Sequence, residues 1–298
     1  MVLQLLFLLL QPPKAEPFSL GKDVTQIVVG WLDEDRILVE RRNLINNHGC
    51  ILEIRNTKTR ALECSHKIPE GWTPVHDHAL SPNRKTILAK AYGQPDRIGL
   101  FTVHGGLIKS WKATVALEFE YDPVWLPDGT HFVTHNPFNQ VLLYDINRRK
   151  AVKQVFIRDI RIYRWAGSLP SGNLFGVNVW GNGLVQRQEF SLNRPNSSQT
   201  ELLETPIEAT GSARYVISPD SKRLAWLSRV LRSDNVNVEE YIVMVSDTSC
   251  KEFDTITSFI PTKDTGYGHL LWKPSGKALS IEVFSAAGRT LKVIPLPP

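Results

Sequence analysis

A turn followed by an apolar strand recurs along the whole chain, and this repeat constrains the fold more than any other feature. In five copies a proline is followed by Asn, Asp or Ser and then by an apolar strand; the prolines are Pro82, Pro127, Pro170, Pro219 and Pro274. An earlier copy carries Asp33 at the same place. We call these six sites the proline position. They recur every 43 to 55 residues, which is the length of one four-stranded propeller blade.

The composition of each copy explains why it predicts strands. Proline at the second position of a turn fixes φ, and a following Asp or Asn with glycine favours a tight turn. Gly129, after Pro127 and Asp128, is therefore predicted to adopt a positive φ. The segments between turns are short and rich in Val, Ile, Leu and aromatic residues, as in 141–146 and 241–247. Four such strands per copy, with almost no helical periodicity, predict an all-β chain.

The expected architecture is a six-bladed β-propeller of four-stranded antiparallel blades. A seven-bladed ring is the alternative if the longest spacing, of 55 residues, or the segment 192–208 contains a degenerate unit. The last copy has only three strands before the chain ends. We expect the segment 16–20 to supply the fourth by pairing with 289–294, because joining the two ends in one blade removes an exposed sheet edge. Deleting residues 1–22 should then destabilise the whole ring.

The first residues are apolar and separate from the repeats. Residues 1–10 contain no charge and resemble the core of a signal peptide, but they are too short to span a bilayer. They lack a preceding Lys or Arg and a small-residue cleavage site. We interpret 1–15 as a degraded leader and 16–298 as a single propeller domain, which places the protein in the periplasm or outside the cell. Alternatively, these residues form a first strand of the fold, or the natural start lies further upstream. If they are not a signal, the protein is expected in the cytoplasm.

The three cysteines are too few and too widely spaced for a disulfide framework or a paired-cysteine zinc site. Cys50 and Cys64 flank a predicted hairpin. One register would place them opposite each other as a disulfide, and a shift by one residue would leave them as free thiols on opposite faces.

The repeat resembles that of a known group of proteins. The sequence Ser218-Pro219-Asp220 before an apolar strand, and tryptophan two residues before the proline in Trp125 and Trp272, are similar to the repeat of TolB-like and WD-like bacterial propellers. The same repeat is found in the propellers that cap prolyl-oligopeptidase-type enzymes. The resemblance covers nearly the whole chain and implies the fold, but propellers serve many functions.

Catalytic and cofactor motifs do not accompany this repeat. The chain contains no Gly-x-Ser-x-Gly, phosphate loop, Gly-x-Gly-x-x-Gly or His-Glu-x-x-His sequence. Its net charge of +5 comes from scattered Lys and Arg, which is unlike the basic stripe of a nucleic-acid-binding protein. We expect a monomer that binds a protein partner, with no nucleic acid, cofactor or metal and no stable membrane insertion.

The candidate site residues lie five positions before the proline position, on the first strand of each blade. They are Asp77, Asp122, Arg214 and His269, together with Arg164, which lies six positions before Pro170 and replaces Trp165 if that strand is shifted by one residue. Propeller symmetry should bring these residues together around the channel as a ligand-binding site. We expect one of the aspartates to pair with Arg214 or His269. His76 and His78 share a strand face beside them. The simpler interpretation is a hydrated channel with internal ion pairs.

These observations favour a non-enzymatic module that binds a protein or a small ligand. The alternative is a carbohydrate lyase or hydrolase that acts at the central channel, for which His76, His78 and His269 are the candidate residues.

Overall fold

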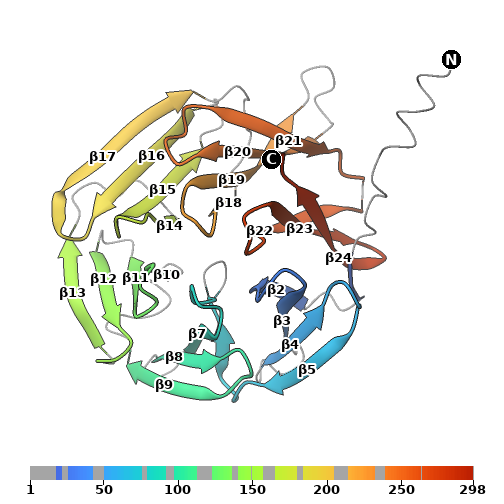
Figure 1. Ribbon diagram of the computed structural model, residues 1–298, viewed down its shortest axis with the longest axis horizontal. Coiled ribbons are helices and arrows are strands. Elements are labelled where there is room, and N and C mark those ends of the chain that lie inside the picture. Colours follow the sequence, from blue (N-terminus) through green and yellow to red (C-terminus); the bar gives the residue numbers. More distant parts are fainter. Residues whose placement is uncertain are drawn as a thin grey trace.

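The structure of the protein is a computed structural model in which the regular elements of the described residues are all β-strands. It describes residues 18–21, 26–42, 50–75, 79–91, 97–112, 123–135, 140–148, 150–156, 165–179, 184–204, 214–231, 239–262 and 264–297. The strands form six separate antiparallel sheets of four strands each, set radially around a central axis (Figure 1). The prediction of an all-β six-bladed propeller is confirmed.

Each of the first three blades is built from four strands that are consecutive in sequence. Blade 1 contains β2 (Gln26–Trp31), β3 (Arg36–Arg42), β4 (Cys50–Asn56) and β5 (Leu62–Lys67). Blade 2 contains β6 (Trp72–Pro74), β7 (Thr86–Ala91), β8 (Arg97–Thr102) and β9 (Leu107–Lys112). Blade 3 contains β10 (Val124–Trp125), β11 (His131–His135), β12 (Gln140–Asp145) and β13 (Lys150–Phe156).

The next two blades follow the same rule, whereas the sixth combines both ends of the chain. Blade 4 contains β14 (Trp165–Ser168), β15 (Leu174–Val179), β16 (Leu184–Ser191) and β17 (Arg194–Glu204). Blade 5 contains β18 (Arg214–Ile217), β19 (Arg223–Leu231), β20 (Glu239–Asp247) and β21 (Phe253–Phe259). Blade 6 contains β22 (Gly266–Trp272), β23 (Ala278–Ser285), β24 (Gly288–Pro295) and the N-terminal β1 (Phe18–Gly21).

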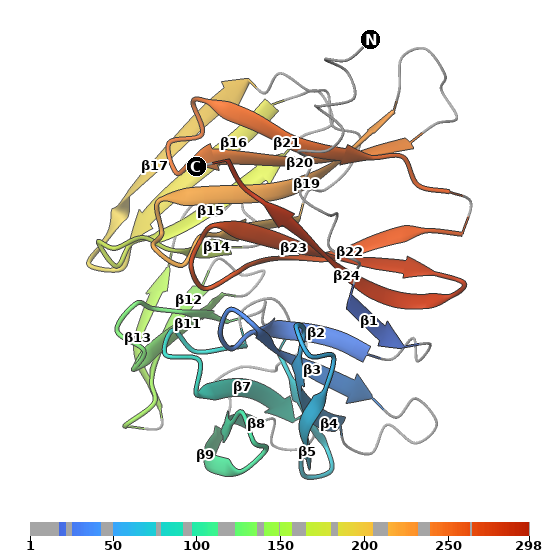
Figure 2. The same ribbon diagram turned by 45° about the vertical axis from the view of Figure 1, so that its right-hand side comes forward.

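Strand β1 closes the ring as the sequence predicted. It pairs antiparallel with β24, with Phe18 opposite Leu291, and the turned view shows it beside both β24 and β2 (Figure 2). Phe18 and Leu20 are buried in a cluster that also contains Val28 of blade 1. The seven-bladed alternative is wrong, because the segment proposed to hide another unit contains β17, the outer strand of blade 4.

The hydrophobic core is a series of seams between neighbouring blades. The five core clusters each combine buried residues of adjacent blades; for example, Phe175 and Val177 of blade 4 pack in one cluster with Trp226 and Met244 of blade 5. This arrangement explains the uninterrupted apolar segments of the sequence, since a strand packed on both faces needs apolar side chains on both faces. Among the described residues, no helix has the length and apolar character to cross a membrane.

In blades 1, 3 and 6, the tryptophan two residues before the proline position links the blade to the one before it. The indole N–H groups donate hydrogen bonds across the seam: Trp31 to the Ser280 hydroxyl at 2.8 Å, Trp125 to the Ala79 carbonyl at 3.1 Å and Trp272 to the Val216 carbonyl at 3.0 Å.

Three blades have no tryptophan at this place, and other donors link them to the preceding blade. Ser168 Oγ donates to the Trp125 carbonyl at 3.1 Å and Ser221 Oγ donates to the Ser168 carbonyl at 3.0 Å. The Arg84 guanidinium donates to the Trp31 carbonyl. All six seams are therefore bridged by a hydrogen bond close to the channel.

The turn after the first strand also forms as predicted. The Gly129 amide donates to the Leu126 carbonyl at 3.0 Å, and Gly129 has a φ of 65°. Two residues after the proline position φ is positive in five blades, at Arg84, Gly129, Gly172, Ser221 and Gly276. Arginine and serine thus adopt a backbone conformation that favours glycine.

The three cysteines are free. Cys64 lies opposite Ile54 in the β4–β5 pair, and Cys50 lies opposite Arg42 in the β3–β4 pair. The open choice between a Cys50–Cys64 disulfide and free thiols is therefore resolved as free thiols, because Cys50 is at the far end of β4 from the residue that faces Cys64.

Candidate functional site

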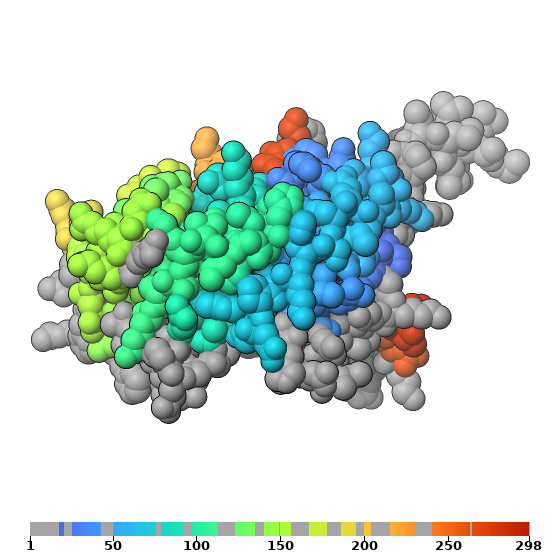
Figure 3. Space-filling view, turned by 90° about the horizontal axis from the view of Figure 1, so that it is seen from below, coloured from blue at the N-terminus to red at the C-terminus, as the bar shows by residue number. Residues whose placement is uncertain are grey.

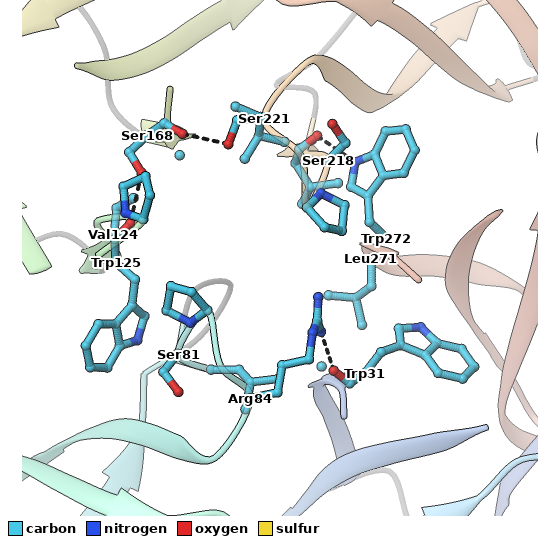
Figure 4. A pocket seen from close by; sticks show the side chains of 18 of the residues that line it. Trp31, Ser81, Arg84, Val124, Trp125, Ser168, Ser218, Ser221, Leu271 and Trp272 are labelled. Carbon is cyan, nitrogen blue, oxygen red and sulfur yellow. Dashed lines mark hydrogen bonds between the residues drawn. The ribbon is translucent and has the colours of Figure 1, made fainter. Parts of the chain in front are cut away.

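A cavity of about 300 Å³ lies at one mouth of the central channel. It is surrounded by the first strands and first turns of all six blades, and Figure 4 shows its side chains arranged around an open centre. The residues two positions before the proline position all line it: Trp31, Leu80, Trp125, Ser168, Ile217 and Trp272. We call this space the channel-mouth cavity.

Small residues allow the first strands to come together at this mouth. A Cβ atom on Gly167 of β14 would lie 2.4 Å from Ile217 Cγ2 of β18, so a larger residue would push blades 4 and 5 apart. A Cβ atom on Gly30 of β2 would lie 3.2 Å from Leu80 Cδ2 of blade 2. Glycine at position 167 is therefore required for close contact between blades 4 and 5, whereas a larger residue at position 30 would need Leu80 to shift by a few tenths of an ångström.

The wall of the cavity is mixed in character. Leu80, Val124 and Leu271 are apolar wall residues, while Ser81 and Ser218 bring hydroxyl groups. Both hydroxyl groups are buried.

Each hydroxyl is already bonded within its own turn. Ser81 Oγ donates to Asn83 at 2.7 Å and accepts from the Thr86 amide at 3.1 Å. Ser218 Oγ donates to Asp220 at 2.5 Å in the same manner. These hydroxyls stabilise turns, and neither has a hydrogen bond to a histidine or lysine of the described residues that would activate it as a nucleophile.

Arg84 is the one ionisable side chain among the described residues that line the cavity. It is half-buried, and burial lowers the pKa of its guanidinium from the usual value, against the opposing effect of Glu34. The guanidinium extends along the edge of the opening to the Trp31 carbonyl (Figure 4). Of its five N–H groups, this bond uses one, and within the described part of the chain no other hydrogen bond or ion pair involves them.

The residues predicted from the sequence to form the site are only partly described. His76, Asp77, His78, Asp122 and Arg164 lie outside the described residues. The expected pairing of an aspartate with Arg214 or His269 therefore stays a prediction.

Two of the predicted residues can be placed. Arg214 is the first residue of β18, and His269 is half-buried within β22. His269 does not line the channel-mouth cavity. The cavity is formed nearer the proline turns, two or three residues further along the same strands.

Sequence reasoning missed Arg84, although the sequence carried a signal. Two residues after the proline position the chain has glycine in three copies and serine in one, and Arg84 stands at the same place in blade 2. A long charged residue where a turn favours glycine indicates a role beyond the turn. That comparison identifies Arg84 without any structure.

Sequence reasoning also missed three buried glutamates. Glu40, Glu53 and Glu282 are fully or almost fully buried. Burial raises the pKa of Glu40. The ion pair between Arg42 Nε and Glu40 Oε1, at 2.7 Å, partly opposes this rise. An isolated carboxylate inside an apolar strand, as in 278–284, was the available signal.

Glu282 has a structural role beside the channel. Its Oε1 accepts a hydrogen bond from the Val28 amide at 2.6 Å, which joins blade 6 to blade 1. Its Oε2 lies 3.5 Å from the His269 amide of its own blade. Both amides belong to residues five positions before the proline position, and of these two residues only His269 was a predicted site residue.

Comparisons with known proteins support the architecture. No model of a protein family matches the chain, and no curated protein matches it. Many solved chains share its fold. One is the crystal structure of the Cps50 (Swd1) β-propeller domain of Myceliophteria thermophila, with a TM-score of 0.57 and 9% sequence identity, covering 95% of this chain and 99% of that chain. At this identity the likeness is one of fold, and by its fold the protein is a six-bladed β-propeller.

Proposed function

We propose that the protein is a non-enzymatic binding module whose channel-mouth cavity receives the C-terminal carboxylate of a peptide or protein partner. The observation that carries the proposal is Arg84, a half-buried arginine at the edge of the cavity and the one ionisable side chain among the described residues that line it. A guanidinium binds a carboxylate through two parallel hydrogen bonds, and such a bond is strong where water is partly excluded.

The backbone of Arg84 supports a role beyond the turn. Its φ of 60° is a conformation that costs a non-glycine residue about 1–3 kcal/mol. Glycine meets the same requirement without that cost at Gly129, Gly172 and Gly276. Residues held in such conformations often belong to binding sites.

The size and wall of the cavity suit the end of a chain. A volume of about 300 Å³ is at the lower limit for ligand pockets, which favours one or two terminal residues over a large ligand. Leu80, Val124 and Leu271 would contact the apolar part of those residues. The net charge of +5 would favour the approach of an anionic group.

Peptides with free and blocked C-termini test the proposal. Fluorescein-labelled peptides of random sequence with a free carboxyl group would be screened by fluorescence anisotropy, and each peptide that binds would be remade as the C-terminal amide. We expect the free acid to bind at least about tenfold more tightly, as a charge-assisted hydrogen bond contributes about 1.5–3 kcal/mol. Equal binding of acid and amide would contradict the proposal.

Two arginine variants separate binding from stability. Arg84→Gln should lose the preference for the free acid, whereas Arg84→Lys should keep part of it. Arg223→Gln is the matched control, because Arg223, like Arg84, donates to a backbone carbonyl of a neighbouring blade, at Gly276, but does not line the cavity. Competition by acetate or another small carboxylate as strong as by the peptide would assign the cavity to a small free acid instead.

A further inference from the structure

Three side chains with metal-binding atoms meet at the outer edge of the seam between blades 1 and 2. Cys64 and His66 belong to β5, the outer strand of blade 1, and His104 belongs to the turn between β8 and β9. In Figure 3 the blue atoms of blade 1 and the teal and green atoms of blade 2 form one continuous surface on this side of the ring. The cluster is remote in the fold from the channel-mouth cavity, and none of its residues lines that cavity.

The β5 strand presents two of the ligands on one face. Cys64 and His66 are two residues apart, so their side chains point to the same side of the strand. They lie opposite Ile54 and Leu52 of β4, which belong to the core cluster of this seam. Both are half-buried, while the alternate residues of the strand are exposed. The face that carries the thiol and the imidazole is therefore the one turned toward blade 2.

The turn that carries His104 is closed by its own backbone hydrogen bonds and lies close to β5. The Thr102 amide donates to the Gly106 carbonyl at 2.8 Å, and the Gly105 amide donates to the Thr102 carbonyl at 2.9 Å. Gly105 has a φ of 80°, and a Cβ atom there would lie 3.1 Å from His66 Cβ. A glycine is thus required for the turn to approach His66 so closely.

The distances suit a single bound ion. Cys64 Sγ lies 3.9 Å from His104 Nδ1, and the rings of His66 and His104 meet edge to face with centroids 5.3 Å apart. One ligand atom from each residue lies within 4.8 Å of the other two. Tetrahedral zinc holds such atoms roughly 3.3–3.6 Å apart, so side-chain rotations that bring them together by about 1 Å would complete the site.

We propose that Cys64, His66 and His104 form a zinc site that joins blades 1 and 2 at the rim of the propeller. One thiolate and two imidazoles are ligand types that bind zinc in preference to magnesium or calcium. On binding, the S–H bond of Cys64 breaks, the proton passes to solvent, and a sulfur–zinc bond forms. With three protein ligands, the fourth position faces solvent and takes water or a side chain of a partner.

Thiol reactivity gives a direct test, because the other two cysteines are inaccessible. Cys50 and Cys250 are buried, and burial raises the pKa of both thiols, that of Cys250 to about 12. In the native protein, without a histidine tag, a disulfide reagent that releases a coloured thiolate should therefore titrate Cys64 alone. We expect zinc to slow this reaction at least tenfold, magnesium to have no effect, and a chelator to restore the rate.

Histidine variants distinguish a specific zinc site from a reactive thiol that binds zinc nonspecifically. His104→Gln and His66→Gln should each abolish the protection by zinc while Cys64 still reacts. His131→Gln is the control, because His131 is a half-buried histidine of blade 3 whose partners are Asp128 and Asp145. It should leave the protection unchanged.

A second measurement does not depend on the reagent. Cobalt(II) added to the protein should give the thiolate charge-transfer absorption of a Co–S bond, and zinc should displace it at one equivalent. The proposal is overturned if zinc leaves the reactivity of Cys64 unchanged, or if the histidine variants are protected as well as the parent protein. Absence of the cobalt band, or its persistence in Cys64→Ser, would overturn it as well.

Discussion

Shortening one side chain of β1 should destabilise the entire propeller, because this strand completes the last blade. Leu20 is fully buried, in a cluster with Val28 of blade 1 and Leu291 of β24. Leu20→Ala removes apolar contacts on both sides of the closing seam and leaves a cavity that rigid neighbours cannot fill. A buried Leu→Ala change costs about 2–5 kcal/mol, which lowers the Tm of a domain of this size by roughly 3–8 °C.

Leu62→Ala makes the same chemical change at an exposed site. Leu62 is on the outer strand β5 and is 55% exposed, so its shortening should cost less than about 1 kcal/mol. The comparison separates the loss of burial from the general effect of the substitution.

Urea unfolding followed by tryptophan fluorescence and by circular dichroism measures both variants. The tryptophans lie in several seams, so a loss of ring closure should shift both signals together in one transition. Deleting residues 1–22 should have a larger effect of the same kind. Closure of the ring by β1 would be contradicted if Leu20→Ala is no less stable than Leu62→Ala, or if a separate early transition shows that only the last blade has opened.

Three further changes test individual contacts. Gly129→Val should lower the free energy of unfolding by about 1–3 kcal/mol, because φ is 65° at this residue. A Cβ atom there would meet nothing within 4 Å, so backbone strain is the only expected cause. A loss beyond this range in urea unfolding would contradict that cause. Glu282→Ala should cost about 1–3 kcal/mol because the buried Val28 amide loses its acceptor; Glu282→Gln, which keeps an acceptor, should cost less, and equal losses would count against this bond. The hydrogen bond from the Ser218 hydroxyl lowers the pKa of Asp220 from its usual 3.8, and this effect is larger than the opposing effect of burial. A lowered pKa stabilises the folded state above the unfolded pKa, so the deficit of Asp220→Asn in urea unfolding should be present at pH 7 and shrink as the pH falls to about 3; a deficit independent of pH would exclude this linkage.

The fold was predictable because each blade repeats the same local signal. Proline at the second turn position, a small polar residue and an apolar strand specify the first hairpin of a blade, and six copies specify the ring. Even the closure was visible, as the last copy lacked one strand. The sequence did not predict the hydrogen bonds across the seams that Trp31, Trp125 and Trp272 donate. These bonds depend on how far neighbouring blades are rotated relative to each other.

The site was less accessible from the sequence for a geometric reason. Counting from the proline position gives the order of residues along a strand, but it does not give the depth at which six strands come closest. The cavity is formed near Trp31 and Trp125, several residues from the level of His269. Arg84 could have been found by comparing turn residues between copies.

The rim cluster illustrates a second limit. Cys64 and His66 share a strand face in any register, but His104 belongs to the next blade, 38 residues later than His66. Its approach depends on the positive φ of Gly105 and on the packing of one blade against another. No spacing rule for metal ligands contains that information.

The most direct test of the proposed binding site is the side-chain NMR signal of Arg84 during a peptide titration. Protein labelled with ¹⁵N-arginine gives one Nε–H signal for each arginine, and the signal missing from Arg84→Lys identifies Arg84. Adding a peptide with a free C-terminus should shift this signal with the same Kd as the anisotropy measurement, and the peptide amide should not. A peptide that binds while the Arg84 signal stays in place, with changes only in arginines remote from the channel-mouth cavity, would contradict the account.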